Sequence, residues 1–343
     1  IANDVQLASI NADGSLASFK TIVGLENNRI GHTLIAWQGG LYRLGGCRVQ
    51  DPGSGTCTNT IFDVDYGVIN KTGEASTVNS SQAYGTAPCS GGDPYSCDLP
   101  GTSYIGNMLT GTAIYNGYLY IIGGCTNNAC TTSTGNIAYQ AIQTDGSLVR
   151  PNVCPNGNYV SSYCIDDVNT ISTNRVASST TVFDNRIYLV GGNTGGAESN
   201  RVNYVSINDD GSLAGAWSSQ TMEGGGATLG ATSVSFSYAY ARANPSSAST
   251  VPGNLYILGG CTGTGPGCTG YVDAVYKCQI LPSGAIGDGT GGSSKCTTSG
   301  QLQIGTIPGG SGTGLAAHAG TVYANYIYLI GGIGNGIVDL ATV

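Results

Sequence analysis

The sequence predicts an all-β fold built from repeated antiparallel sheets, and three observations support this prediction. Two short motifs alternate along the 343-residue chain, and only 9% of its residues are charged while Gly accounts for 56. No segment shows a sustained helical period of about 3.6 residues. Short apolar strands separated by Gly-rich turns, repeated along a chain, are typical of proteins made of many small sheets.

The first motif is a Gly-Gly doublet that follows a short apolar strand, as in "YLYIIGG" ending at Gly124. Every copy has a tyrosine three residues before its first Gly. Because side chains alternate along a strand, we expect this tyrosine to pack between neighbouring sheets, while Gly allows a close backbone approach at the doublet. The doublets begin at Gly45, Gly123, Gly191, Gly259 and Gly331, and their tyrosines are Tyr42, Tyr120, Tyr188, Tyr256 and Tyr328.

The second motif is an apolar strand that runs into a tight turn, as in "YVSINDDGSL" starting at Tyr204. Gly accepts a positive φ at low cost, so a Gly between a polar run and an apolar residue predicts a hairpin turn. The acids Asp13, Asp145 and Asp209 are expected to serve these turns rather than catalysis. In each copy the turn Gly follows an Ile: Ile10 and Gly14, Ile69 and Gly73, Ile142 and Gly146, Ile207 and Gly211, Ile280 and Gly284.

Each repeat therefore supplies four strands: one ahead of the doublet, the doublet strand, the Ile strand and one after the turn. In the third repeat they read "ASSTTVF", "RIYLVGG", "VNYVSI" and "LAGAWSS". The doublet after an apolar strand resembles the kelch repeat, and the resemblance covers nearly the whole chain, although the copies are longer than the roughly 50 residues of that repeat. It implies a β-propeller with five kelch-like four-stranded blades, formed by residues 1–343 as a single domain.

The two chain ends compete for one place in the last blade. Residues 4–10 ("DVQLASI") and 337–343 ("IVDLATV") both match the third-strand motif, which occurs six times for five doublets. We expect the N-terminal strand to complete the blade begun by the C-terminal strands, so that the closing blade is shared between both ends. The surplus strand would then either add to a neighbouring subunit or begin a further blade of a longer propeller.

The cysteines predict an oxidising, extracellular or cell-surface location. Zinc ligands usually come in paired Cys-x-x-Cys spacing, which is not seen here. Six short-range disulfides explain the even number better, and such density is typical of secreted proteins. No signal peptide is visible at "IANDVQ", which fits a mature secreted chain. The twelve cysteines pair in chain order as Cys47 and Cys57, Cys89 and Cys97, Cys125 and Cys130, Cys154 and Cys164, Cys261 and Cys268, and Cys278 and Cys296.

The two histidines occupy equivalent positions. His32 and His318 each lie 13 residues before a doublet, and the same offset gives Thr110 and Ser178. If first strands line the propeller axis, these four residues form a polar ring near one mouth of the channel. Two imidazoles there could hold a metal or a small anion. The alternative is that both rings simply hydrogen-bond to neighbouring backbone, and no cofactor is predicted.

Charge and hydropathy exclude two classes of partner. The formal net charge of −8 argues against nucleic acid and against anionic lipid. No stretch approaches the length of about 18 apolar residues that a spanning helix needs, so no membrane insertion is expected. Two sequons, at Asn70 and Asn79, are candidate glycosylation sites. An insertion over residues 238–254 is expected to form a decorated surface loop or a binding contact.

No trusted catalytic signature emerges from the sequence. Phosphate-binding loops, a Gly-x-Ser-x-Gly elbow and an HExxH motif are not found. Copper-oxidase and sialidase-like propellers would need a Tyr–Cys crosslink or an Arg cluster, and neither is indicated. We therefore expect a non-enzymatic structural subunit of an extracellular surface assembly or filament, whose partners are other copies of itself. The alternatives are an adhesion or glycan-binding propeller and, less favoured, a secreted glycan-active enzyme.

Overall fold

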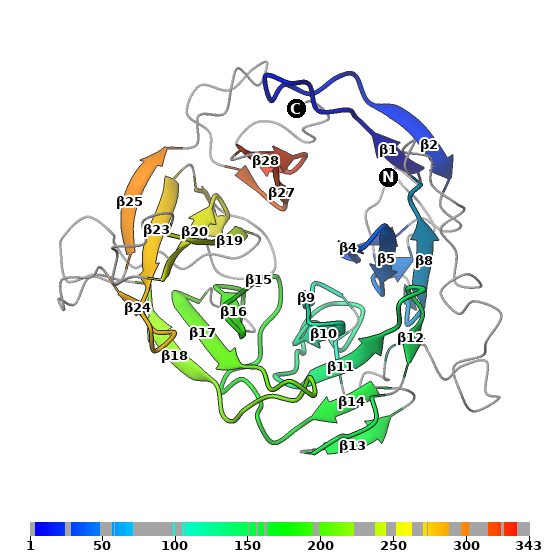
Figure 1. Cartoon of the computed structure of the whole chain (residues 1–343), viewed down its shortest axis with the longest axis vertical. Helices are drawn as coiled ribbons and strands as arrows, with labels where there is room; N and C mark the ends of the chain where they lie inside the picture. The colour runs from blue at the N-terminus through cyan, green and yellow to red at the C-terminus, as the bar shows by residue number, and fades with distance from the viewer. Residues whose placement is uncertain are drawn as a thin grey trace. The chain divides into compact units, whose positions relative to one another are not determined.

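The computed structural model describes the chain in these ranges: 4–24, 29–48, 57, 59–70, 99, 105–106, 108–149, 151–155, 157–160, 163–194, 199–222, 237–244, 252–262, 270–272, 274–287, 296–301, 315–323 and 326–334. Within them the secondary structure is all-β, and every paired strand runs antiparallel to its neighbour (Figure 1). None of the described segments forms a helix long and apolar enough to cross a membrane. The chain divides into two compact units, Ile1–Val176 with Asn208–Leu213, and Ala177–Ile207 with Ala214–Val343.

The first unit contains the N-terminal hairpin and the first two repeats. The hairpin is a two-stranded sheet of β1 (Asp4–Leu7) and β2 (Lys20–Gly24). The first repeat orders its strands as β4 (Thr33–Trp37), β5 (Gly40–Leu44) and β8 (Val64–Val68), and a small sheet joins β3 (Arg29–Ile30), β6 (Cys47–Arg48) and β7 (Asn59–Thr60). The second orders β9 (Gly111–Tyr115), β10 (Tyr118–Ile122), β11 (Ile137–Ile142), β14 (Tyr163–Asp166) and β13 (Gly157–Val160), with β12 (Leu148–Val149) also on β11.

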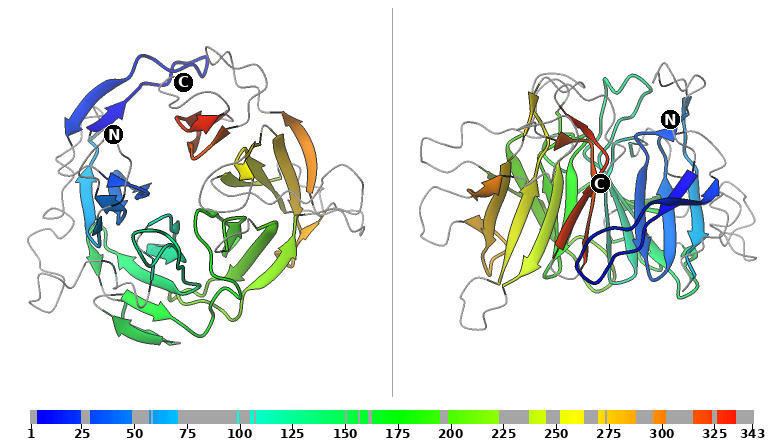
Figure 2. Two further views of the ribbon diagram at one scale, coloured as in Figure 1. Left: turned by 180° about the vertical axis from the view of Figure 1, so that it is seen from behind. Right: turned by 90° about the horizontal axis from the view of Figure 1, so that it is seen from above.

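The second unit contains the remaining three repeats, visible from behind in Figure 2. The third repeat is the four-stranded sheet β15 (Ser179–Phe183), β16 (Arg186–Val190), β17 (Arg201–Ser206) and β18 (Ser218–Thr221). The fourth orders β19 (Tyr238–Ala243), β20 (Gly253–Leu258) and β23 (Ala274–Ile280), and β23 also pairs with β24 (Ile286–Gly287) and β25 (Cys296–Gln301). The fifth is the hairpin β27 (Ala319–Tyr323) and β28 (Tyr326–Ile330); two small ladders pair β21 (Cys261–Thr262) with β22 (Gly270–Tyr271) and β26 (Leu315–Ala316) with β29 (Ile333–Gly334).

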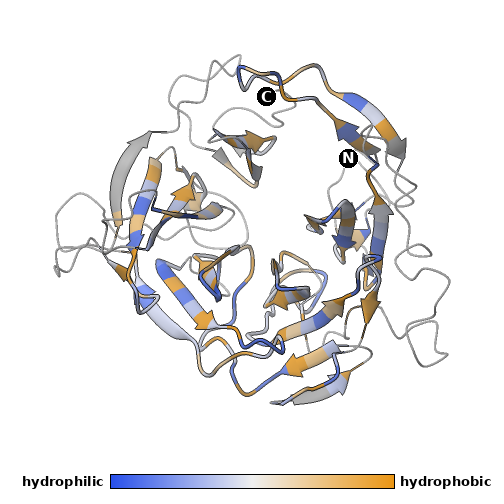
Figure 3. Ribbon diagram, viewed as in Figure 1, coloured by the Kyte–Doolittle hydropathy of each residue, from blue (hydrophilic) through white to orange (hydrophobic). Residues whose placement is uncertain are grey.

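The described strands of the repeats follow the predicted order, and the register is the same in all four repeats that have a described third strand. The doublet tyrosine faces the same motif position each time: Tyr42 faces Tyr66, Tyr120 faces Tyr139, Tyr188 faces Tyr204 and Tyr256 faces Lys277. A shared register places every core side chain on the same face of its sheet. Figure 3 shows the resulting alternation of hydrophilic and hydrophobic residues along β17.

Four of the five predicted turns form and close in the same way, and the fifth, at Gly73, lies outside the described residues. In the third repeat the Gly211 amide donates to the Asn208 carbonyl (3.0 Å), and Gly211 has a φ of +82°. The other described turn glycines, Gly14, Gly146 and Gly284, have φ values of 85° to 86°. One assignment was wrong by a residue: the turn acid is Asp210, whose carboxylate accepts from the Ser212 amide (3.0 Å), and not Asp209. The acid must precede Gly for its carboxylate to reach the amide two residues on.

The doublet glycines combine a positive φ with a close approach. All ten have φ between 56° and 118°, a region that side-chain-bearing residues rarely adopt. A Cβ at Gly124 would lie 2.5 Å from Thr110 Cγ2 and 2.9 Å from the Met108 carbonyl oxygen. The close packing predicted from the motif is therefore present, and the left-handed backbone is a second reason for Gly that the sequence motif did not reveal.

The doublet tyrosines latch each repeat to the turn of the next. The Tyr42 hydroxyl donates to the Gly146 carbonyl (2.6 Å), and Tyr120 donates to Gly211 (2.8 Å) in the same unit. In the second unit Tyr188 donates to Gly284 (3.0 Å). All three donor rings are fully buried. The predicted packing of these tyrosines between sheets is confirmed, and the hydroxyl adds a polar contact that repeats from one motif to the next.

We expect Tyr120→Phe to lower the free energy of unfolding by about 1–3 kcal/mol, because it leaves the buried Gly211 carbonyl without its donor. Burial already raises the pKa of Tyr120, so the hydroxyl stays protonated and donating across the usual pH range. Urea unfolding measures the change as a lower midpoint at constant slope. Tyr323→Phe is the matched control, because that side chain is 59% exposed; equal losses in both variants would contradict the latch.

Three of the predicted disulfides form: Cys47–Cys57, Cys125–Cys130 and Cys278–Cys296. Cys261 is also disulfide-bonded, while its predicted partner Cys268 lies outside the described residues, as do Cys89 and Cys97. The predicted Cys154–Cys164 bridge does not form, and both remain thiols. Cys164 lies in the middle of β14, opposite Tyr139 of β11, and its Sγ donates to the Val153 carbonyl (3.5 Å). The hairpin β13–β14 thus extends a sheet, where an inter-blade loop was expected.

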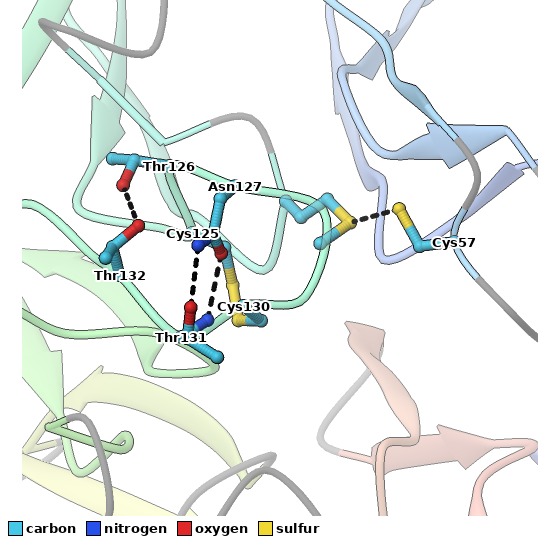
Figure 4. Close-up of a disulfide and its surroundings, with 8 residues drawn as sticks. Cys57, Cys125, Thr126, Asn127, Cys130, Thr131 and Thr132 are labelled. Atoms are coloured by element: carbon cyan, nitrogen blue, oxygen red, sulfur yellow. Dashed lines mark hydrogen bonds between the residues drawn. A yellow bond between two sulfur atoms is a disulfide. The ribbon is translucent and has the colours of Figure 1, made fainter.

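The Cys125–Cys130 bridge closes a short loop that hydrogen bonds also hold (Figure 4). The Thr126 hydroxyl donates to Thr132 (2.7 Å), and the Asn127 side chain donates to the Thr131 hydroxyl (2.7 Å). Across from it, Cys57 Sγ lies 3.9 Å from the Sδ of Met108. Met108 is buried in a cluster with the Cys47 and Cys125 side chains, so sulfur atoms form much of this part of the core.

Candidate functional site

The first strand of every repeat is preceded by a polar residue at one equivalent position. Each of these residues stands one place before the first pair between the first strand and the doublet strand: His32, Thr110, Ser178, Ser237 and His318. The sequence predicted four of the five and missed Ser237. The insertion lies between β19 and β20, so counting back from the doublet gives the wrong residue in the fourth repeat. We call these five the first-strand polar positions.

In the first unit, the first-strand polar positions are set by the doublets and joined by hydroxyls. A Cβ at Gly46 would lie 2.9 Å from His32 Cβ, as one at Gly124 would meet Thr110. Only Gly therefore leaves room for these side chains behind the doublet. Thr33 Oγ1 lies 3.3 Å from Thr110 Oγ1 and 3.3 Å from the Thr110 carbonyl oxygen, which links two neighbouring first strands.

In the second unit, the same contact recurs between serines. Ser179 Oγ donates to the Ser237 carbonyl and lies 3.0 Å from Ser237 Oγ. His318 is 8% exposed, and neither of its ring nitrogens has a hydrogen-bond partner among the described residues. The buried Ser178 hydroxyl is likewise without a partner among them. The Leu258 backbone nevertheless interacts with the His318 ring, and the Arg29 backbone with the His32 ring, so the expected alternative of imidazoles that bond to neighbouring backbone stays open.

Burial keeps both imidazoles neutral. It lowers the pKa of His318 from 6.5 to about 4, and the nearby Leu258 backbone only partly opposes this. Burial also lowers the pKa of His32 to about 4, and the positive charges of Arg43 and Arg29 add to the effect. A neutral imidazole offers one donor and one acceptor but no positive charge. The predicted binding of a small anion by these rings is therefore disfavoured near neutral pH.

A depressed histidine pKa makes stability depend on pH. The unfolded chain protonates His318 at about 6.5, whereas the folded chain resists protonation down to about 4. This contribution is therefore present above pH 6.5 and is lost as the pH falls towards 4, by about 2–3 kcal/mol. We expect His318→Gln to flatten the fall between pH 6.5 and 4 in urea unfolding. A variant that loses stability in parallel with the original chain would show that His318 does not titrate in this way.

The described residues do not form a metal centre of the usual kind. None of them brings three His, Cys, Asp or Glu side chains together. His32 and His318 belong to different units, and the ring that would unite them is a prediction taken up below. Within each unit, the first-strand polar positions offer hydroxyl groups and one neutral imidazole, which can hydrogen-bond to an uncharged polar ligand.

A buried ionic cluster lies close to His32, and the sequence did not predict it. The Asp65 side chain is fully buried and forms ion pairs with Arg29 (3.2 Å) and Arg43. Arg29 also bonds to Asp63 (3.2 Å) and donates to the Gly45 carbonyl of the doublet (3.3 Å). These charges hold one another and the doublet in place. The cluster therefore stabilises the first repeat, and its carboxylates form ion pairs with arginine side chains.

Both end hairpins expose side chains that the complete repeats bury. Ile10, after β1, is 38% exposed, whereas its counterparts Ile142, Ile207 and Ile280 are 8%, 6% and 0% exposed. Ile327 of β28 is half-buried, whereas the equivalent Ile187 of β16 is fully buried. Neither two-stranded sheet has a third strand among the described residues. By motif, β27–β28 corresponds to the first two strands of the other repeats and β1–β2 to the last two.

The remaining predicted surface features are only partly covered by the structure. Asn70 is exposed at the end of the first repeat, while Asn79 lies outside the described residues, as do residues 337–343. The start of the predicted insertion forms β19, which pairs with β20 along its full length from Tyr238 to Ala243. The part of the insertion over 245–251 is also outside the described residues.

Comparison with known proteins gives a fold and no family. No family model matches the chain, and no curated protein is similar to it in sequence. Among solved structures, 187 chains match. One, titled "Structure of YjhT", aligns over 97% of this chain and 85% of its own length with a TM-score of 0.57 and 12% identity. Similarity at this level of identity shows a shared all-β fold alone.

Proposed function

We propose that the chain is a non-enzymatic structural subunit of an extracellular assembly, folded as a kelch-type propeller of five four-stranded blades. The common register of the described repeats and the likeness over 97% of the chain support the fold. In this fold the fifth blade combines β27–β28 with an N-terminal hairpin of the β1–β2 type. The first-strand polar positions would then line one end of the axial channel.

The observation that carries the assembly role is the partial exposure of apolar side chains on the two-stranded sheets β1–β2 and β27–β28. Ile10, after β1, is 38% exposed, and Ile327 of β28 is half-buried. Apolar side chains at the margin of a sheet offer a surface against which another chain can pack. This surface supports the partners expected from the sequence, other copies of the chain.

The composition supports an extracellular role. Only 9% of the residues are charged, and part of this charge lies in the buried cluster around Asp65. Disulfides close loops in both units, which requires an oxidising environment. Together they describe a rigid subunit whose surface is hydrated mainly by hydroxyl and amide groups.

A test of the proposed function is the state of the purified, oxidised chain. We expect light scattering after gel filtration to show species larger than the 34.7 kDa chain, and electron microscopy to show regular assemblies. The equilibrium should shift towards the monomer on dilution. A chain that stays monomeric at every concentration reached would contradict the structural role.

A glycan-binding role is the second candidate, because two aromatic side chains are exposed together at the end of one hairpin. Tyr323 is 59% and Tyr326 51% exposed, and they face each other across β27 and β28. Exposed tyrosine rings offer an apolar face and a polar tip, as binding surfaces often do. A glycan array on the monomeric fraction, repeated with Tyr323→Ala, would give a signal that the substitution removes if this role is correct.

A further inference from the structure

The first repeat gathers positive charge around β3 and β6. In a chain with only 12 Lys and Arg, three arginines act on one another here: Arg29, Arg43 and Arg48. Among the described residues, the carboxylates that face them are Asp63, which pairs with Arg29, and Asp65, which pairs with Arg29 and Arg43. Three guanidinium groups against two carboxylates leave one positive charge in excess.

Two of these arginines stand opposite each other. Arg29 of β3 and Arg48 of β6 are directly opposite in an antiparallel ladder. Directly opposite residues point to the same face with Cβ atoms about 4.5–5.5 Å apart, and like charges placed there repel each other. Arg48 is exposed, whereas the Arg29 side chain is fully buried and its Nε has no hydrogen-bond partner among the described residues. The pair therefore joins a surface guanidinium to a buried one with an unused donor.

The electrostatics of the cluster show the same excess. Burial lowers the pKa of Arg29, and the charges of Arg43 and Arg48 lower it further, although the two carboxylates act in the opposite direction. The pKa of His32 falls to about 4, first through burial and then through the charges of Arg43 and Arg29. An added negative charge would favour the charged form of each of these side chains.

We propose that a small monovalent anion, of the size of chloride, binds between the guanidinium groups of Arg29 and Arg48. Guanidinium groups supply several N–H donors and keep their charge at every physiological pH. The positive charge thus comes from arginine, and the neutral imidazole of His32 lies beside the site without having to supply it. The buried position of Arg29 restricts the site to a small ion. This inference does not depend on the proposed function.

The chain contains two histidines, so NMR can follow each imidazole separately, and His318→Gln assigns the remaining signal to His32. The test titrates the ring protons of the full, oxidised chain from neutral to acidic pH, in sodium chloride and in sodium gluconate at equal ionic strength. Gluconate is too large to enter beside a buried side chain. Because a nearby anion favours the charged imidazole, we expect the protonation constant of His32 to be about three- to tenfold higher in chloride.

His318 is the internal control for this titration. Among the described residues, only burial and the Leu258 backbone shift the pKa of His318, so no arginine acts on it. Its protonation constant should be the same in both salts. An equal rise for His32 and His318 would reveal a general effect of chloride on the folded chain and would overturn the site.

Arg48→Gln removes the exposed guanidinium and should abolish the chloride response of His32. Because Arg48 is exposed, the variant should stay folded, and an unchanged His318 signal checks this. Arg201→Gln is the matched control, since Arg201 is also an exposed arginine on a strand, and it should keep the full response. If the response survives Arg48→Gln, or if the original chain shows none, the proposed site is wrong.

Discussion

Replacing Asp65 with asparagine is expected to lower the free energy of unfolding by about 3–5 kcal/mol, the cost of breaking a buried ion pair from one side. Asp65 is fully buried, and its carboxylate accepts from Arg43 Nε (2.6 Å) and from Arg29 (3.3 Å). Asparagine has the same shape but no charge. It therefore removes the carboxylate that two buried guanidinium groups share, and Arg29 keeps only its ion pair with the partly exposed Asp63.

Asp63→Asn is the matched control, because Asp63 pairs with the same Arg29 but its side chain is 39% exposed. Water can replace this contact, so we expect a loss within about 1 kcal/mol. Urea unfolding at pH 7, with circular dichroism as the probe, gives both values. If the two variants lose equal stability, the buried cluster does not carry the stability of the first repeat.

The parts of the fold that the sequence predicted are those encoded by short, repeated segments. A Gly four residues after an Ile fixes a turn without help from the rest of the chain, and Gly14, Gly146, Gly211 and Gly284 all adopt the expected positive φ. The doublets and their tyrosines were predictable for the same reason. Because the motifs recur, the structural interpretation of each copy is supported by the other copies.

The parts that were missed depend on contacts that no repeat encodes. β25 pairs with β23, and the residues between β24 and β25 separate it from the rest of the repeat in the sequence. The sequence predicted the disulfide between Cys278 and Cys296, but it did not predict that the two cysteines would lie opposite each other on paired strands. In the third repeat the strand after the turn begins at Ser218, later than the expected segment "LAGAWSS". The buried cluster around Asp65 uses residues of one repeat alone. Charged residues that occur in a single repeat produce no repeated pattern in the sequence from which the cluster could be predicted.

The candidate site illustrates the same limit. The sequence identified His32 and His318 by their equal offset, but it did not indicate that burial would lower the pKa of both to about 4. Burial depends on the whole packed sheet rather than on spacing. Ser237 was missed because a strand-lengthening insertion changed the offset. Function was the least predictable property, since one fold of this kind supports many activities.

The second large effect is expected from the Cys278–Cys296 disulfide, which joins directly opposite residues of β23 and β25. Replacing both cysteines with alanine should lower the free energy of unfolding by about 3 kcal/mol in the chain-entropy model, because the bridge closes a loop between residues 18 apart. Both side chains are buried, at 0% and 2% exposure, so alanine also leaves a small void. Hydrogen exchange should show β25 losing protection before β20 does.

The Cys125→Ala, Cys130→Ala variant provides the comparison. Its cysteines are only five residues apart, and the hydrogen bonds from Thr126 to Thr132 and from Asn127 to Thr131 remain to hold the loop. The same model gives a loss of about 2 kcal/mol, which these bonds should reduce further. The order of the two losses is therefore the decisive measurement. A larger loss at Cys125–Cys130 would mean that β25 stays on β23 through backbone pairing alone, and that the bridge between them adds little.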